Sequence, residues 1–410
     1  MLLMDILIYT GIFLGLYFSI FVFSIFFEHR KHIYKKELKE NFPKVCLIVP
    51  CYNEERNVGK TLEALLNLDY PKEKLEIIVI DDGSEDNTFL KAKAFEKKDE
   101  RIKLFRKKNG GKYTALNFAI KKTNARFIGS VDADSYVETN ALKRLMKYFE
   151  DEEVKAVVST IKIVKAKNVL ERIQYLEYLI SAFLRKVFSL TNSLNVVPGP
   201  LSVIRKEVFE KLGPYKEAHQ TEDMEMAFRM QKANLKIAHA MNSIIYTNPC
   251  STFKALLRQR LRWRRGFLLN LRDYPELLNI KKYGNLSFLF YYYLLGGSVS
   301  IILIFYGFWK TSSLILEKIT HLSWINFDIS FPSLSQIDLF SFNFRPFLFL
   351  GIFGLLMFAL YTFLSKKLTF DKTPLKGKAV FYILFFAILN VMWWVSAIFS
   401  IATKREAVWR

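Results

Sequence analysis

Cysteine is scarce in this chain, and the cysteines that occur form no pattern. Cys46, Cys51 and Cys250 are the three cysteines among 410 residues. Their number and spacing fit neither a disulfide framework nor a set of zinc ligands. This excludes the small disulfide-stapled and zinc-stabilised classes of protein. It also indicates that the domain holding these cysteines lies in a reducing compartment.

Acidic residues are also few, since 39 aspartates and glutamates stand against 60 lysines and arginines, for a net charge of +21. Such an excess attracts nucleic acid, anionic lipid or phosphorylated small molecules. The sequence carries no signature of a nucleic-acid-binding module, so we expect no nucleic-acid partner. Internal repeats and low-complexity segments are absent as well. Membrane lipid and nucleotide are therefore the favoured partners.

Long apolar runs, in contrast, are abundant. An uncharged run covers residues 6–27 and is long enough to span a bilayer, and further runs follow at 286–308, 347–364 and 379–402. Between the second and third of these runs we expect only a polar loop, from Lys310 to Phe344. Basic residues follow the first run, and it lacks the leading charge and small-residue cleavage site of a signal peptide. Because positive charge marks the cytoplasmic side, we expect an uncleaved anchor with its N-terminus outside.

The lysine-rich segment 366–378 marks a second cytoplasmic region. With four spans, the globular part and this segment lie inside and the C-terminus lies outside. Lys404 and Arg405 disagree with an outside C-terminus, which leaves a re-entrant segment open. We therefore expect a multi-pass plasma-membrane protein with a cytoplasmic catalytic domain. Its expected parts are an anchor (1–28), a catalytic domain (44–252), amphipathic interface helices (253–283) and a membrane region of about three spans (284–410).

Between the first and second apolar runs, strand and helix patterns alternate. Short β-type runs occur at 45–50, 76–80, 102–105 and 127–131, and helical patterns lie between them. This alternation predicts an α/β domain with a mostly parallel, doubly wound sheet. In such sheets, ligands bind beyond the carboxyl ends of the strands.

Three polar clusters fall at that expected edge. Tyr52-Asn53-Glu54 follows the first strand, Asp81-Asp82 ends the second, and Asp132-Ala133-Asp134 follows the fourth. In an extended chain, side chains at i and i+2 point the same way, so Asp132 and Asp134 aim two carboxylates at one point. Two hard oxygen ligands suit Mg²⁺ or Mn²⁺ carrying a diphosphate. The alternative is an ordinary turn at a strand end, where aspartate is common.

Two further motifs each have a structural and a functional interpretation. In Asn109-Gly110-Gly111-Lys112 the glycines allow close backbone approach to a ligand, and Lys112 suits a phosphate; the alternative is a plain glycine turn. In Thr221-Glu222-Asp223 a helical pattern begins. It fits either an N-terminal cap or a carboxylate acting as a general base.

A basic and aromatic segment completes the set. On a helix, Gln259, Arg262 and Trp263 share a face. Tryptophan and arginine offer a stacking platform and fixed cationic donors, which suit a sugar and a pyrophosphate. A basic interfacial helix on anionic lipid is the alternative, and the two interpretations are compatible.

Taken in order, these motifs resemble the membrane-embedded processive family 2 glycosyltransferases, which include the hyaluronan, chitin, poly-N-acetylglucosamine and cellulose synthases. The resemblance covers about 45–271 and the flanking spans. It implies a GT-A (Rossmann-like) fold, a nucleotide-sugar donor (usually UDP-linked), Mg²⁺ or Mn²⁺, and inversion at the anomeric carbon. The Gln-x-x-Arg-Trp motif accompanies the processive members of the family.

The resemblance also implies a role for each motif residue. Asp223 is the general base, Asp132 and Asp134 hold the metal, and Tyr52, Asp81 and Asp82 hold the nucleoside. The remaining donor- and acceptor-binding residues are Glu54, Lys112, Asp132, Glu222, Gln259, Arg262 and Trp263. The expected acceptor is a growing polysaccharide that is exported, with a homo-oligomer or an accessory export subunit left open. The alternatives are single-sugar transfer to a polyprenyl-phosphate or glycolipid, and a non-catalytic assembly subunit.

Overall fold

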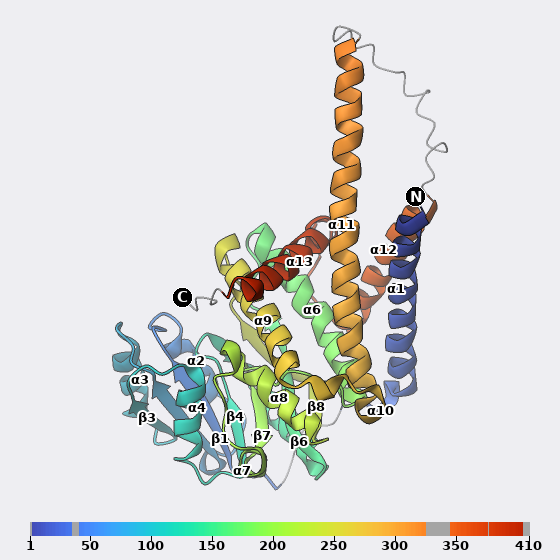
Figure 1. Cartoon of the computed structure of the whole chain (residues 1–410). Helices are drawn as coiled ribbons and strands as arrows, with labels where there is room; N and C mark the ends of the chain where they lie inside the picture. The colour runs from blue at the N-terminus through green and yellow to red at the C-terminus, as the bar shows by residue number, and fades with distance from the viewer. Residues whose placement is uncertain (1, 35–40, 325–344, 376, 405–410) are drawn as a thin grey trace.

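The computed structural model describes residues 2–34, 41–324, 345–375 and 377–404. In these ranges an eight-stranded sheet is covered by helices and adjoins a group of long apolar helices (Figure 1). The strands are β1 (Val45–Cys51), β2 (Leu75–Asp81), β3 (Ile102–Arg106), β4 (Phe127–Ser130), β5 (Ser135–Val137), β6 (Val154–Ile163), β7 (Ser202–Arg205) and β8 (Lys236–Thr247).

The α-helices divide into those that cover the sheet and those that are long and apolar. The first group is α2 (Val58–Leu66), α3 (Thr88–Glu96), α4 (Lys112–Ile120), α5 (Ala141–Met146), α6 (Val169–Leu190), α7 (Lys206–Leu212), α8 (Glu222–Lys232), α9 (Phe253–Asp273) and α10 (Ile280–Tyr283). The second is α1 (Leu2–Glu28), α11 (Asn285–Trp324), α12 (Arg345–Leu368) and α13 (Lys378–Ala402).

The sheet has the order β3-β2-β1-β4-β7-β6-β8-β5. Its first half is parallel, because β1 pairs with β2 and β4, and β2 pairs with β3. This confirms the predicted α/β fold with a mostly parallel sheet. β7 and β5 are antiparallel to their neighbours and were not predicted. Each has only four or three residues, too few to show a period-2 pattern.

Alternating residues of β1 supply two separate cores. Val45, Leu47 and Val49 pack with α2 and α5 on one face of the sheet. Cys46 and Ile48 pack with α4, α6 and α8 on the other. The second core also contains residues of α1 and α11, such as Val22 and Leu289. The sheet and the apolar helices therefore share one hydrophobic core.

Four helices are long and apolar enough to cross a membrane, as predicted: Ile6–Glu28, Asn285–Ser313, Gly351–Leu368 and Phe385–Ala402, among the described residues. The predicted polar loop from Lys310 to Phe344 is wrong in its first part, because α11 continues to Trp324. Residues 310–324 contain no glycine or proline, so nothing in the sequence ends the helix there. The rest of that predicted loop, 325–344, lies outside the described residues.

The segment after α12 is fixed to the sheet domain. The Lys162 ammonium on β6 donates to the Thr369 carbonyl at 2.8 Å, and the Tyr175 hydroxyl on α6 donates to Asp371 Oδ1 at 2.9 Å. Thr369 and Asp371, two residues apart in the predicted cytoplasmic segment, thus lie against the sheet domain. α1, α11 and α12 run side by side, whereas α13 lies across α6 and α9 (Figure 1).

Candidate active site at the carboxyl edge of the sheet

The loops that follow β1 and β2 are tied to each other. The backbone N–H of Asn53 donates to Ser84 Oγ at 3.0 Å, and that of Glu85 donates to Asn53 Oδ1 at 2.9 Å. The N–H of Glu54 donates to Thr88 Oγ1 at 2.7 Å, which joins the loop to the start of α3. Half-buried Tyr52 lies between β1 and these contacts. The first two predicted clusters are therefore held together at one edge.

Asp81 and Asp82 are both buried, and their carboxylates have different interaction partners. Asp81 pairs with the Arg106 guanidinium at 3.0 Å. Asp82 accepts from the backbone N–H groups of Gly110 and Gly111, at 3.2 and 2.9 Å, and pairs with Lys107. Asp82 thus holds the glycine loop at the same edge as Asp81.

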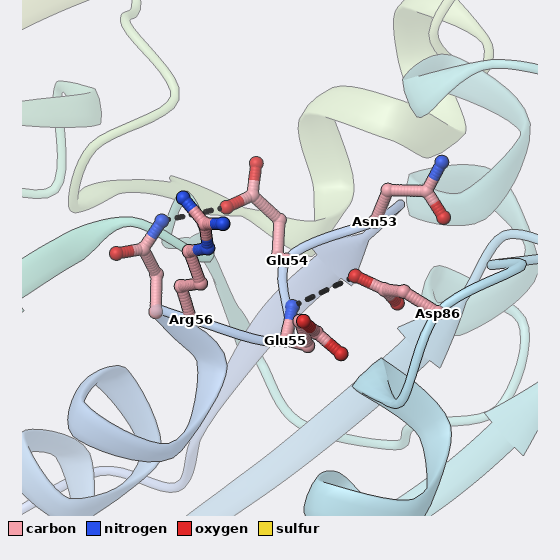
Figure 2. Close-up of a pocket in the computed structure, with 6 residues that line it drawn as sticks. Asn53, Glu54, Glu55, Arg56 and Asp86 are labelled. Atoms are coloured by element: carbon pink, nitrogen blue, oxygen red, sulfur yellow. Dashed lines mark hydrogen bonds between the residues drawn. The ribbon is translucent and has the colours of Figure 1, made fainter.

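A cavity of about 390 Å³ opens beside these loops. Figure 2 shows that Asn53, Glu54, Glu55 and Arg56 line it together with Asp86, which lies just before α3. Glu55 N–H donates to Asp86 Oδ2 across the cavity at 3.1 Å. The predicted site residue in its lining is Glu54. The lining of this cavity therefore does not include the cluster of charged residues described next.

Lys112 connects three of the predicted motifs. It begins α4, and its ammonium lies 2.6 Å from Asp132 Oδ1 and 3.6 Å from Glu222 Oε1. Burial favours the neutral amine, but the charges of Asp132, Glu222 and Asp223 outweigh it and raise the pKa of Lys112. A charged lysine that is paired with carboxylates can exchange these partners for the phosphates of a ligand.

The punctuated loop before β7 seals this ion pair on one side. A Cβ on Gly199 would lie 2.4 Å from Lys112 Nζ and 2.5 Å from Asp132 Oδ1, so any larger residue here would displace this ion pair. Ser130 Oγ donates to the Gly199 carbonyl at 3.1 Å, and the Val197 N–H donates to the Asp223 carbonyl at 3.2 Å. The 196–202 loop is therefore a wall of the site.

Asp223 lies in the first turn of α8, next to buried Glu222. Burial and the negative charge of Glu222 raise the pKa of Asp223 to about 6, against the opposing charges of Lys112 and Arg262. Thr221 occupies the N-cap position of α8, as the capping alternative predicted, but its side chain makes no capping hydrogen bond. Its hydroxyl donates to the Ala218 carbonyl and accepts from Asn270 Nδ2 instead, at 2.9 Å in each case.

Helix α9 is docked closely onto the start of α8. A Cβ on Gly266 would meet Thr221 Cγ2 at 2.4 Å, so the two helices touch where Gly266 has no side chain. Arg262 Nη1 donates to the Gln220 carbonyl at 2.8 Å, one residue before Thr221. This docking brings Arg262 near Asp223, as the predicted roles require.

The turn before α8 has an unusual backbone that the sequence did not reveal. Ala218, His219 and Gln220 have φ values of 46°, 55° and 64°, three consecutive non-glycine residues in the left-handed region. Such residues cost roughly 1–2 kcal/mol each. Arg262 bonds this turn through Gln220, and His219 Nε2 lies 2.7 Å from Asp273 Oδ2 of α9. Contacts with α9 therefore stabilise the turn that presents Asp223.

The predicted common face of Gln259, Arg262 and Trp263 is divided between two surroundings. Arg262 faces the α8 turn, whereas Gln259 and Trp263 contact Arg260. Arg260 Nη1 donates to Gln259 Oε1 at 2.7 Å, and its guanidinium lies 4.1 Å from the Trp263 ring centroid. Arg260 also pairs with Glu177 of α6 at 2.6 Å. Sequence reasoning missed the pair between Arg260 and Glu177, because it joins two helices that are far apart in the sequence.

The two predicted metal ligands do not sit on an extended strand. β4 ends at Ser130, and Asp132 to Ser135 form a turn closed by the Ser135 N–H to Asp132 carbonyl bond at 3.0 Å. The i, i+2 argument is therefore wrong in its geometry. In the described part of the chain no three His, Cys, Asp or Glu side chains gather as a metal cage. Mg²⁺-type ions are usually held by one or two carboxylates plus substrate phosphates. Asp132 and Asp134 fit such a shared site.

This geometry defines an α/β domain with a largely buried cluster of cationic and acidic residues at the carboxyl edge of its sheet. Residues 46–213 match the family model described as Glycosyl transferase family 2. These residues are therefore similar to the family 2 glycosyl transferases, and the similarity supports a glycosyltransferase.

Curated relatives agree with this class. The chain is 31% identical over 279 residues to the probable glycosyltransferase YdaM of Bacillus subtilis, covering 65% of each chain. It is 26% identical to the poly-beta-1,6-N-acetyl-D-glucosamine synthase of Staphylococcus epidermidis, covering 67% of this chain and 68% of that one. It is 28% identical to the beta-monoglucosyldiacylglycerol synthase of Synechocystis, covering 57% and 50%. The matches thus span between half and about two thirds of these relatives.

A solved structure supports the same fold. The mannosyltransferase PcManGT of Pyrobaculum calidifontis, in complex with GDP-Man and Mn²⁺, superposes with a TM-score of 0.60 at 16% identity. The superposition covers 98% of this chain and all of that one. The predicted GT-A-type fold with apolar helices is therefore confirmed.

Proposed function

We propose that this protein transfers a sugar from a UDP-sugar, with inversion, to the end of a growing polysaccharide at the cytoplasmic membrane face. The best candidate donor is UDP-N-acetylglucosamine or a related UDP-hexose. One observation carries the proposal: Lys112 joins Asp132 to Glu222 beside Asp223, at the edge of a domain that is similar to the family 2 glycosyl transferases. This arrangement combines a cation for a diphosphate with a base for an acceptor hydroxyl.

The donor occupies the side of the cluster formed by β1, β2 and β4. Tyr52, Asp81 and Asp82 hold the nucleoside, where the two loops are already fixed to each other. Glu54 supports this loop through its backbone bond to α3. Lys112 and Arg262 face the diphosphate and stabilise the negative charge that develops as it leaves.

The acceptor reacts at Asp223. An acceptor hydroxyl attacks the anomeric carbon opposite the diphosphate, and the Asp223 carboxylate takes its proton. Glu222, buried beside it, keeps the pKa of Asp223 raised and hence the carboxylate basic. Trp263 and Gln259 on α9 contact the acceptor sugar, with Arg260 supporting the indole ring from its other face.

Asp132 and Asp134 would hold Mg²⁺ or Mn²⁺ together with the donor diphosphate. The bound ion would neutralise phosphate charge there. Lys112 neutralises Asp132 through their ion pair at 2.6 Å.

Removal of the metal provides a direct test of these two ligands. We expect EDTA to stop transfer and Mn²⁺ or Mg²⁺ to restore it. In Asp134→Asn the metal concentration for half-maximal transfer should rise more than about tenfold, because one of few ligands is lost. Asp69→Asn, which alters an exposed partner of Lys143, is the control. An unchanged metal requirement in Asp134→Asn would exclude Asp134 as a ligand.

The raised pKa of Asp223 predicts a pH profile. A general base acts only when deprotonated, so kcat/KM should rise with pH through an inflection near the Asp223 pKa of about 6 and then level off. In Glu222→Gln one source of that raised pKa is removed, and the inflection should move to lower pH. Initial rates between pH 4.5 and 8 measure both. An inflection that does not move in Glu222→Gln would argue against Asp223 as the titrating base.

A second candidate acceptor is a membrane glycolipid. The similarity to a beta-monoglucosyldiacylglycerol synthase favours it, whereas the Gln259-x-x-Arg262-Trp263 motif and the similarity to a poly-N-acetylglucosamine synthase favour a polymer.

We propose that 44–252 is the catalytic domain, 253–283 the interface helices, and 1–28 and 284–410 the plasma-membrane parts, with export through a homo-oligomer or a partner subunit left open.

A donor screen tests the proposal. The full chain in nanodiscs is incubated with each UDP-sugar, and with GDP-mannose for comparison, and nucleoside diphosphate release is measured. We expect release with one UDP-hexose in the presence of Mn²⁺ or Mg²⁺. Failure to turn over any nucleotide sugar would instead favour a non-catalytic assembly subunit.

A further inference from the structure

Helix α13 has two apolar faces with different surroundings. Its inner face packs on α6 and α9 and contains buried Leu389 and Trp393. Its outer face contains Phe385, Met392 and Phe399, which are all exposed. These three residues are seven positions apart, so they lie on one side of the helix. Because both faces are apolar, hydropathy alone marks α13 as a candidate span.

The two helices beside α1 give a scale of depth. The Phe18 ring of α1 stacks on Tyr292 of α11 at 4.1 Å, and Ser19, the next residue, accepts from the Tyr361 hydroxyl of α12 at 3.2 Å. Tyr292 lies seven residues after the start of α11, and Tyr361 lies seven residues before the end of α12. The ends of α11 and α12 that join the sheet domain therefore lie at one level.

On this scale, α13 keeps nearly the same depth along its length. The Tyr382 ring stacks on Phe358, ten residues before the end of α12. Trp394 lies beside Gly297, twelve residues after the start of α11, where an added Cβ would be 3.0 Å from the indole. At 1.5 Å per residue, these two depths are about 15 and 18 Å. A helix running alongside α11 would instead change depth by about 18 Å between residues 382 and 394.

The helix that α13 covers is strongly basic. α9 carries seven lysines and arginines among its 21 residues. Arg264 Nη2 donates to Asn390 Oδ1 at the middle of α13, at 2.8 Å, and its guanidinium lies 4.8 Å from the Trp394 ring centroid. The Arg260 guanidinium lies 5.6 Å from the Trp393 ring centroid. α13 therefore covers guanidinium groups that would be costly to expose to lipid hydrocarbon.

We infer that α13 does not cross the membrane but lies within it, roughly parallel to its plane. Its outer face contacts the acyl chains of membrane lipids, and its inner face separates the basic helix α9 from them. Exposed apolar side chains of the same kind, such as Leu295 and Leu356, occur on the neighbouring candidate spans of α11 and α12. Figure 1 shows α13 crossing the direction of α11, with its last turn far from the outer end of that helix.

This arrangement changes the expected side of Lys404. The chain leaves α12 on the sheet-domain side, where Thr369 and Asp371 are fixed to β6 and α6. If α13 does not cross, Lys404 lies on that side too. Positive charge marks the cytoplasmic side of a membrane protein, so Lys404 and Arg405 then agree with a cytoplasmic sheet domain. α1, α11 and α12 remain as the crossing helices.

The depth of the outer face tests the inference. Phe385→Cys, Met392→Cys and Phe399→Cys are each prepared in the full chain, spin-labelled and placed in nanodiscs. Collision of each label with oxygen and with a water-soluble nickel complex measures its depth, and wild type labelled in parallel gives the background from the native cysteines. We expect all three labels to lie inside the bilayer at one depth.

The matched control is α11, where Leu295→Cys, Ile302→Cys and Trp309→Cys occupy exposed positions with the same spacing. Seven residues rise about 10 Å along a helix, so these labels should differ in depth. Labels on α13 that differ in depth as those on α11 do would overturn the inference, and so would labels on α13 that lie in water.

A second measurement asks on which side α13 ends. Lys404→Cys is treated with a membrane-impermeant maleimide in sealed vesicles of each orientation. Ala94→Cys, at an exposed position on α3, reports the side of the sheet domain, and Leu316→Cys, beyond the candidate span of α11, reports the opposite side. We expect Lys404→Cys to be labelled in the same vesicles as Ala94→Cys. Labelling in the same vesicles as Leu316→Cys would show that α13 crosses the membrane.

Discussion

Replacing Asp223 by asparagine is expected to lower sugar transfer by about 10²–10⁴-fold, the usual contribution of a positioned general base. The amide is nearly the same size but cannot accept the acceptor proton. Donor binding should be unaffected, because Lys112 and Asp132 remain in place. Transfer is measured by product formation, and donor binding by isothermal titration with the UDP-sugar and metal.

The control for this substitution is Asp69→Asn, which removes one carboxylate at a largely exposed position that pairs with Lys143. It should leave both transfer and donor binding unchanged. If Asp223→Asn gave normal product yield, Asp223 would not be the base. If it abolished donor binding as well, its role would be in holding the donor.

The second large effect is expected from Gly266→Ala. The added Cβ would lie 2.4 Å from Thr221 Cγ2 and 2.5 Å from Thr221 Oγ1, so α9 and the start of α8 must move apart. That movement displaces Arg262 relative to Asp223, and a displacement of about 1 Å can cost on the order of 10²-fold in rate. We expect kcat to fall by about 10–100-fold while the chain still folds, which circular dichroism and thermal unfolding verify.

Gly59→Ala is the matched control, because it is also a helical glycine. A Cβ there meets the Phe95 ring at 3.5 Å, an ordinary contact. Alanine should stabilise α2 by up to about 1 kcal/mol and leave kcat unchanged. Normal activity in Gly266→Ala would show that the close approach of α9 to Thr221 does not position the site.

The sequence was informative where a local pattern determines structure. The parallel strands β1 to β4 lie where the sequence has short apolar runs, most of which end in polar clusters. The same patterns placed Tyr52, Asp81 and Lys112 at one edge, since parallel strands all present their carboxyl ends there. These neighbouring residues support the predicted metal site, although the extended geometry assumed for Asp132 and Asp134 was wrong.

Long-range packing was not predictable from the sequence. The contact between Gly266 and Thr221 joins residues that are 45 positions apart, and no local pattern marks it. The left-handed turn at Ala218–Gln220 contains no glycine or asparagine, so its sequence gives no sign of positive φ.

The proposed polymerase activity is tested most directly by following the product of a labelled donor. The full chain in nanodiscs is given a short pulse of labelled UDP-sugar with Mn²⁺ or Mg²⁺ and then an excess of unlabelled donor, and product size is measured over time. Our account predicts a high-mass, water-soluble product whose labelled chains lengthen during the chase. Label that stays in single sugars on an organic-extractable lipid would contradict it.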